Sequence, residues 1–282
     1  MSVTGVGGPS TAGTGVTGIS LLDKAFATAR AESRAALVGY LPAGFPSYDR
    51  CIEACRVMVD AGVDVFEIGL PYSDPLMDGP TIQAAADRAL AGGTGTADVL
   101  RTVEAVAGMG VATVVMSYWN PLERYGIAAF ARDLAAAGGA GAITPDLIPE
   151  EAGPWLDAAA EQRLAPIFLV APSSTDERIR VVAETNAGFV YAASTMGVTG
   201  ARSAVSDRAE ALVARTRKAT SLPIAVGLGV STGDQAAEVA GYADGVIVGS
   251  ALVKVLLDDP DDLAGLSALT SALADGVRRK AG

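Results

Sequence analysis

The amino-acid sequence predicts an α/β protein in which eight parallel strands, each followed by helix, close into one (β/α)8 barrel of the TIM type. Three observations predict this fold. Eight short apolar runs rich in Val, Ile and Ala are spaced along the chain. Amphipathic stretches with apolar residues three and four positions apart separate the runs. The runs are apolar throughout, which is typical of parallel strands covered on both faces.

A doubly wound open sheet is the alternative fold. Such a sheet usually has fewer strands and carries a GxGxxG turn after the first one. The turn after the first expected strand reads YLPAGFPS (40–47), which is not that motif. With 282 residues, half of them hydrophobic, the chain is long enough for one domain of barrel size.

The elements are expected in the following order. Residues 1–18 are mostly Gly, Ser, Thr and Val, with too few large apolar groups to offset the entropy of ordering, so we expect a flexible tail and a barrel domain at 19–282. The helical spacing of ISLLDKAFATARAES (19–33) predicts an extra N-terminal helix. The expected strands follow at 35–41, 63–70, 111–118, 140–147, 165–172, 188–195, 223–230 and 243–250.

The composition excludes several kinds of function. The 32 acidic against 21 basic residues give a net charge of -11, which disfavours nucleic acid and anionic membrane surfaces as partners. The chain has no histidine, so Ser-His and Cys-His catalysis are excluded and no metal site is expected. Cys51 and Cys55 stand four residues apart on one face of an expected helix, which favours a packing role. Without a signal-peptide pattern or a run long enough to span a bilayer, a cytoplasmic location is expected.

The stretch FEIGLPYSDPLMDGP (66–80) places Glu67 late in the second expected strand. Strand periodicity puts Val65, Glu67 and Gly69 on one face, which suits the barrel interior. Because active sites of such barrels lie at the C-terminal ends of the strands, Glu67 is expected in the mouth, beneath a loop carrying Asp74 and Asp78. The alternative is a buried glutamate paired with an arginine, with aspartates that only form turns or cap a helix.

Glycine-rich segments follow the last three expected strands: STMGVTG (194–200), VGLGVS (226–231) and VGSALVK (248–254). Glycines let the backbone approach a ligand, and a helix N-terminus offers unpaired N–H groups. These segments therefore predict a phosphate site made of backbone donors, which suits an acidic protein. The alternative is that the glycines serve only tight turns between strand and helix.

Several motifs together resemble one known family. YLPAGFP, FEIGLPYSDPLMDGPTIQ, APSSTDERI, GFVYAASTMGVTG, VGLGVST and VGSALVK occur in this order, and the resemblance to the α subunit of tryptophan synthase runs from about residue 20 to 280. The resemblance implies cleavage of indole-3-glycerol phosphate to indole and glyceraldehyde 3-phosphate. It also implies an α2β2 assembly with a β subunit that uses pyridoxal phosphate to join indole to serine, and no cofactor in this chain.

The resemblance also implies roles for single residues. Glu67 matches the catalytic glutamate, Asp78 the aspartate that receives the indole N–H, and Tyr191 the active-site tyrosine. The other matching positions are Gly200, Gly229, Gly249 and Ser250 for phosphate, Tyr40, Ile82 and Met116 for the indole pocket, and Asp74, Asn120 and Asp146 for contact or signalling with the β subunit.

Two residues depart from the family pattern. Phe45 stands where many members have aspartate, and Thr195 where many have arginine. Neither is a proposed proton-transfer group, so the departures bear on loop closure and on signalling between subunits.

Three other functions stay open at this point: a free-standing lyase that releases indole, another phosphate-binding barrel isomerase with a different acid–base pair, and a non-catalytic subunit that activates a partner. A Schiff-base aldolase is disfavoured because Lys24, Lys218, Lys254 and Lys280 all fall in expected helices. A zinc aldolase would be expected to supply histidine ligands.

Overall fold

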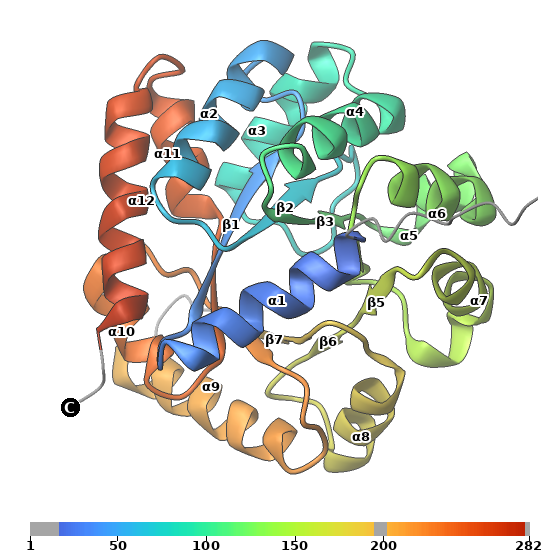
Figure 1. Cartoon of the computed structure of the whole chain (residues 1–282), viewed down its shortest axis with the longest axis vertical. Helices are drawn as coiled ribbons and strands as arrows, with labels where there is room; N and C mark the ends of the chain where they lie inside the picture. Colours follow the sequence, from blue (N-terminus) through green and yellow to red (C-terminus); the bar gives the residue numbers. More distant parts are fainter. Residues whose placement is uncertain (1–16, 195–201, 280–282) are drawn as a thin grey trace, which may run out of the picture.

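The computed structural model describes residues 17–194 and 202–279, and its helices surround a barrel of parallel strands (Figure 1). The elements are α1 Gly18–Ala31, β1 Ala36–Pro42, α2 Tyr48–Asp60, β2 Val65–Gly69, α3 Pro80–Ala91, α4 Thr96–Ala107, β3 Ala112–Met116, α5 Trp119–Tyr125, α6 Ile127–Ala136, β4 Gly141–Ile143, η1 Pro149–Glu151, α7 Gly153–Gln162, β5 Ala165–Ile167, β6 Leu169–Val170, α8 Asp176–Thr185, β7 Val190–Ala193, α9 Arg202–Arg217, β8 Ile224–Gly227, α10 Gly233–Ala240, β9 Gly245–Val248, α11 Ser250–Asp258 and α12 Leu263–Arg278.

The strand order is β5-β4-β3-β2-β1-β9-β8-β7-β6, with parallel pairing throughout. The two strands at the ends of this order, β5 and β6, follow each other directly in the chain and are separated only by Phe168. The sheet therefore runs around a nearly closed barrel, and the predicted (β/α)8 fold is confirmed.

The structure differs from the sequence prediction at the fifth expected strand, 165–172, which is divided into β5 and β6. β5 pairs with β4, whereas β6 pairs with β7. At the switch between partners, the Asn186 side chain accepts a hydrogen bond from the Phe168 N–H (2.9 Å) and donates one to the Phe168 carbonyl (3.2 Å). A side chain thus satisfies the backbone groups where the strand changes partner.

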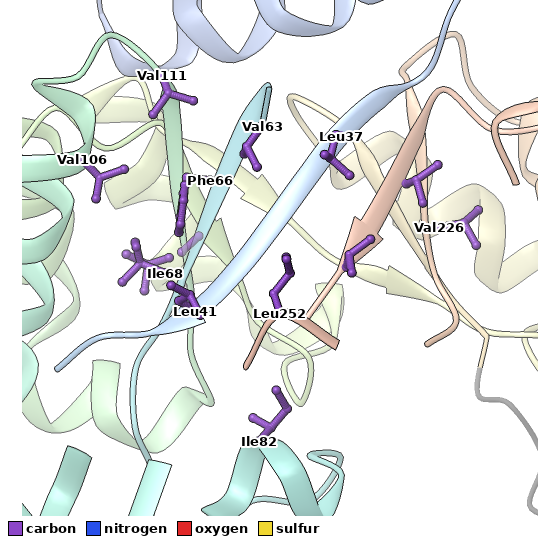
Figure 2. Packing of buried hydrophobic residues seen from close by; sticks show 14 of the residues in the cluster. Leu37, Leu41, Val63, Phe66, Ile68, Ile82, Val106, Val111, Val226 and Leu252 are labelled. Atoms are coloured by element: carbon purple, nitrogen blue, oxygen red, sulfur yellow. The ribbon is translucent and has the colours of Figure 1, made fainter. Parts of the chain in front are cut away.

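The two faces of each strand have different surroundings. Phe66 and Ile68 of β2 point outward into a core shared with the helices, near Val106 of α4 (Figure 2). Val65 of the same strand belongs to the core inside the barrel. Glu67 shares the inner face with Val65, as the periodicity predicts.

Two residues singled out in the sequence lie in the outer core. Cys51 and Cys55 of α2 are free and fully buried there, and the Cys51 thiol donates to the Pro42 carbonyl at 3.5 Å. Phe45, which departs from the family pattern, is also fully buried in this core. All three side chains therefore serve packing between the sheet and its helices.

Helix α1 closes the N-terminal end of the barrel, and Figure 1 shows it lying in front of the strands. Its buried residues Leu22, Phe26 and Ala29, spaced by four and three, pack onto the inner core. The Phe26 ring lies 5.4 Å from that of Phe189, just before β7. Thr17 caps the helix by accepting a hydrogen bond from the Ser20 N–H at 3.4 Å, so residues 17 and 18 belong to the folded chain, while 1–16 lie outside the described residues.

The N-terminal end of the barrel also holds a partly buried ion pair. Arg34, just before β1, donates two hydrogen bonds to the carboxylate of Asp64, just before β2, at 2.7 and 2.8 Å. The Leu37 N–H donates to the same carboxylate at 2.8 Å. Asp64 therefore lies largely out of water with its charge compensated.

Within the described ranges, every helix is too short or too polar to cross a membrane.

Candidate active site at the C-terminal ends of the strands

A cavity of about 410 Å³ opens at the C-terminal ends of the strands. It is lined by Tyr40, Glu67, Met77, Asp78, Gly79, Ile82, Met116, Leu169, Tyr191, Ala193, Ser194, Gly227, Leu228, Gly229, Ile247, Gly249 and Ser250. These include nine of the ten catalytic and substrate-binding residues expected from the sequence. The tenth, Gly200, lies outside the described residues, as does Thr195.

Glu67 is the most deeply buried charged residue of this cavity. Its strand position pairs in register with Tyr40 on β1 and Val114 on β3, and its side chain is 1% exposed. Within the described part of the chain, its Oε2 atom has no hydrogen-bond partner and no basic side chain forms an ion pair with it. The alternative of a glutamate paired with an arginine is therefore wrong among the residues that the structure describes.

The surroundings of Glu67 determine its protonation. Burial, and secondarily the negative charge of Asp78, raise its pKa to about 8. Glu67 is therefore mainly protonated at neutral pH, and its carboxyl group can deliver a proton.

Asp78 lies on the loop between β2 and α3, two residues before the helix begins. Burial raises the pKa of its carboxyl group, and the interaction with the Tyr118 hydroxyl opposes this rise. The Gln83 side chain donates to the backbone carbonyl of Asp78 at 2.7 Å. The side-chain carboxyl thus remains available to the cavity, with an environment more polar than that of Glu67.

Two tyrosines face the carboxyl groups. Burial, followed by the charges of Glu67 and Asp78, raises the pKa of Tyr191, and the same groups raise the pKa of Tyr40. Both hydroxyls therefore stay protonated and can donate hydrogen bonds. A Cβ atom on Gly227 would lie 2.6 Å from the Tyr191 hydroxyl, and one on Gly69 would clash with the Tyr40 hydroxyl, so both sites need glycine.

Three of the apolar residues that line the cavity come from α3, β3 and β6. Ile82 of α3 and Met116 at the end of β3 were expected from the sequence, whereas Leu169 of β6 was not. Leu169 lies two residues after Ile167, which faces the inner core. The period-two pattern across the divided strand is the signal that could have identified it.

The part of the cavity that the sequence predicts to bind phosphate lies at the ends of β8 and β9. Gly229 has φ = 78°, a left-handed conformation that favours glycine. Gly249 is the N-cap of α11 and Ser250 is its first residue. The first N–H groups of this helix have no partners within the helix and point toward the end that lines the cavity.

The residues implied in partner contact are exposed at the same end of the barrel: Asp74 and Asp146 lie on loops, and Asn120 lies in the first turn of α5. The Ser73 hydroxyl donates to Asp74 (2.6 Å), the Asn120 amide donates to the Tyr72 hydroxyl (3.0 Å), and Asp146 accepts from the Trp119 N–H (2.9 Å). The structure therefore brings these loops together around the mouth.

Fold and site together define a class of protein: a (β/α)8-barrel with a cavity at the C-terminal ends of its strands that presents carboxyl and tyrosine side chains, an apolar lining and a helix N-terminus. Among the described residues, no lysine lines the cavity, and no group of three or more potential metal ligands is present.

Comparison with known proteins identifies the family. The sequence model of the family described as tryptophan synthase alpha chain matches residues 26–277. The tryptophan synthase alpha chains of Nocardia farcinica (strain IFM 10152) and Thermobifida fusca (strain YX) are 61% and 58% identical to this chain. The alignments cover 92% and 93% of this chain and 96% and 100% of those proteins.

Solved structures of similar chains indicate the same family. A structure of Mycobacterium tuberculosis tryptophan synthase matches with a TM-score of 0.86 at 55% identity, covering 92% of this chain and 98% of that one. The tryptophan synthase subunit alpha from Legionella pneumophila str. Paris matches with a TM-score of 0.83 at 32% identity, covering 91% and 98%. The chain belongs to the tryptophan synthase alpha chain family.

The activity follows from this membership. The chain is a lyase of tryptophan biosynthesis that cleaves indole-3-glycerol phosphate to indole and glyceraldehyde 3-phosphate, the α reaction of tryptophan synthase.

Proposed function

We propose that Glu67 is the proton shuttle of this cleavage, that Asp78 stabilises the charge that develops on the indole ring, and that Tyr191 orients the substrate. The observation that carries the proposal is the burial of Glu67 without an ion-pair partner among the described residues, which raises its pKa to about 8. A retro-aldol step on an indole needs an acid at neutral pH, and Glu67 supplies one.

The proton balance of the reaction closes when one group acts twice. The Glu67 carboxyl first protonates C3 of the indole ring, which turns the ring into an electron sink. The C–C bond between the ring and the glycerol chain of the substrate then breaks, and its electron pair returns to the ring. The substrate hydroxyl next to the broken bond loses its proton as the aldehyde forms. Glu67, now a carboxylate, accepts that proton and returns to its starting state.

Asp78 has the complementary role. Protonation at C3 places positive charge on the ring nitrogen, and an ionised carboxylate that accepts a hydrogen bond from the N–H stabilises it. Asp78 suits this role because it is less buried than Glu67, and the rise of its pKa by burial is opposed by its interaction with Tyr118. The two carboxyls are thus distinguished by their environments.

The remaining contacts hold the substrate. Tyr40, Ile82 and Met116 border the space for the indole ring, and Gly229, Gly249 and Ser250 lie where the phosphate would meet the N-terminus of α11. We assign Gly200 to the same phosphate site on the resemblance alone.

A β subunit is the proposed partner, in an α2β2 assembly with pyridoxal phosphate in the β subunit and no cofactor in this chain. Family membership supports this proposal, and so does the surface at the barrel mouth. Leu76, Met77 and Ile148 are the large apolar side chains most exposed among the described residues (78%, 51% and 43%), and they lie on loops that follow β2 and β4. The cytoplasmic location stays a prediction.

Release of indole from indole-3-glycerol phosphate tests the residue roles. Glu67→Gln should lower kcat by roughly 10² to 10⁴, because it keeps the shape of the side chain and removes the transferable proton. Glu104→Gln, at an exposed position on α4, is the matched control and should leave kcat unchanged. Near-normal turnover in a folded Glu67→Gln protein would exclude Glu67 as the shuttle.

The same assay, repeated with added β subunit, tests the partner. The rate should rise, because closure of the mouth excludes water and fixes the substrate against Glu67. If the isolated chain is already fully active and the β subunit neither binds nor changes the rate, the chain is a free-standing indole-releasing lyase.

A further inference from the structure

Tyr118, which the sequence analysis did not single out, lies between β3 and the loop that carries Asp78. It is the N-cap of α5, and its side chain is buried although it lies at the mouth of the barrel. Its hydroxyl oxygen accepts a hydrogen bond from the Met77 N–H at 2.9 Å. This backbone group belongs to the residue directly before Asp78, so the contact fixes the loop at the point where the carboxyl group emerges.

The hydroxyl has a second interaction. Its oxygen is engaged by the Met77 N–H, so its own proton remains to be donated. The neighbouring acceptor is the Asp78 carboxyl, whose pKa is lowered by the interaction with Tyr118. The hydroxyl thus holds the backbone of the loop through Met77, and its interaction with Asp78 opposes the effect of burial on the pKa of that carboxyl.

The ring of Tyr118 is held on two sides. It packs against the Tyr72 ring, with 5.4 Å between centroids, and the Tyr72 hydroxyl accepts from Asn120 at 3.0 Å. The backbone next to Tyr118 is fixed as well, since the Trp119 N–H donates to Asp146 at 2.9 Å. These contacts pre-set the position of the hydroxyl before any substrate enters.

We propose that Tyr118 is a positioning residue for the α reaction, which holds the loop at Met77 so that the Asp78 carboxyl is aimed at the indole N–H. This inference rests on the proposed role of Asp78. Tyr118 acts through the carboxyl and does not itself exchange a proton with the substrate. The other titratable groups that face Asp78 are Glu67 from β2, Tyr40 from β1 and Tyr191 from β7. Tyr118 differs from the two other tyrosines because its interaction with Asp78 lowers the pKa of that carboxyl.

The test is Tyr118→Phe, which keeps the ring against Tyr72 and removes the hydroxyl. kcat/KM should fall roughly 10- to 100-fold, the effect of losing a hydrogen bond to a charged group. The acid limb of the kcat/KM profile should move to higher pH, because Asp78 loses the interaction that favours its ionised form. Tyr125→Phe is the control: the Tyr125 hydroxyl donates to Asp133 at 2.9 Å on the outside of the barrel, and neither quantity should change.

A second readout does not depend on activity. The titration of the Asp78 carboxyl, followed by NMR in the protein without substrate, should have a higher midpoint in Tyr118→Phe than in the wild type. An unchanged midpoint would overturn the proposal, even if kcat/KM falls, because the loss would then be structural only. If the wild type fails to cleave indole-3-glycerol phosphate while the midpoint still moves, the proposed role of Asp78 fails and the positioning of its carboxyl by Tyr118 stands.

Discussion

Asp64 and Glu67 lie three residues apart in the same segment, but only Asp64 has partners that compensate its negative charge among the described residues. Asp64, at the entry to β2, accepts two hydrogen bonds from Arg34 and one from the Leu37 N–H. Glu67, near the exit of β2, is 1% exposed and has neither an ion pair nor a partner for Oε2 among the described residues. One carboxylate is compensated, whereas the other is left to gain a proton.

The contrast extends to the two ends of the barrel. At the N-terminal end, α1 fills the opening with Leu22, Phe26 and Ala29, which pack onto the inner core. At the C-terminal end the strands stop around an open cavity, and the loop after β2 exposes Leu76 and Met77. Stability is thus concentrated at one end of the strands and chemistry at the other, which is the division expected of this fold.

The presence of an ion-pair partner, and not burial alone, therefore decides whether a buried carboxyl group is charged or protonated. A buried carboxylate with a bidentate arginine stays charged and joins two strands. A buried carboxyl group without one is held neutral, at a cost to stability that a purely structural residue would not justify.

The largest effect on stability is expected at the compensated end. Arg34→Met leaves Asp64 without its ion-pair partner, so the unfolding free energy should fall by about 3 kcal/mol. The kcat for indole release should stay unchanged, because the pair lies at the opposite end of the strands from the cavity. Chemical denaturation and the indole assay measure the two quantities. An Arg34→Met protein with unchanged stability but reduced kcat would contradict the division between a stabilising end and a catalytic end of the barrel.

A smaller effect, confined to substrate binding, is expected at the mouth. Ser250→Val removes a hydroxyl and adds bulk at the first residue of α11, so KM should rise roughly 10-fold or more while kcat changes less. The phosphate is held in the ground state and the transition state alike, which explains the difference. A soak with glycerol phosphate that places the anion elsewhere would contradict the assignment.

The sequence predicts most of the architecture because strand periodicity and apolar runs are local properties. The inward orientation of Glu67 follows from its alternation with Phe66 and Ile68, and the structure confirms it. The division of the fifth strand at Phe168 could not be predicted, because it depends on Asn186, which is 18 residues away in the chain.

Contacts between residues far apart in the chain also limited the prediction of the site. Motifs located the residues at the strand ends, but Tyr118 ends an apolar run without any motif, and its contact with Met77 spans 41 positions. The Arg34–Asp64 pair likewise joins residues 30 positions apart. Phe45 is explained only by the packing, since its ring is fully buried where many family members have aspartate.

The proposed mechanism depends most on the protonation of Glu67, and the pH dependence of stability tests this protonation directly. The pKa of Glu67 is raised from 4.5 to about 8 on folding, so the stabilising effect of its proton is fully present below about pH 4.5 and is lost as the pH rises toward 8. The chain has no histidine, which leaves this window largely free of other titrations. The measurement is the unfolding free energy of the wild type and of Glu67→Gln between pH 4.5 and 8. The wild type should lose up to about 1.4 kcal/mol per pH unit relative to Glu67→Gln, whereas parallel curves for the two proteins would show that Glu67 is already ionised and would contradict its role as the acid.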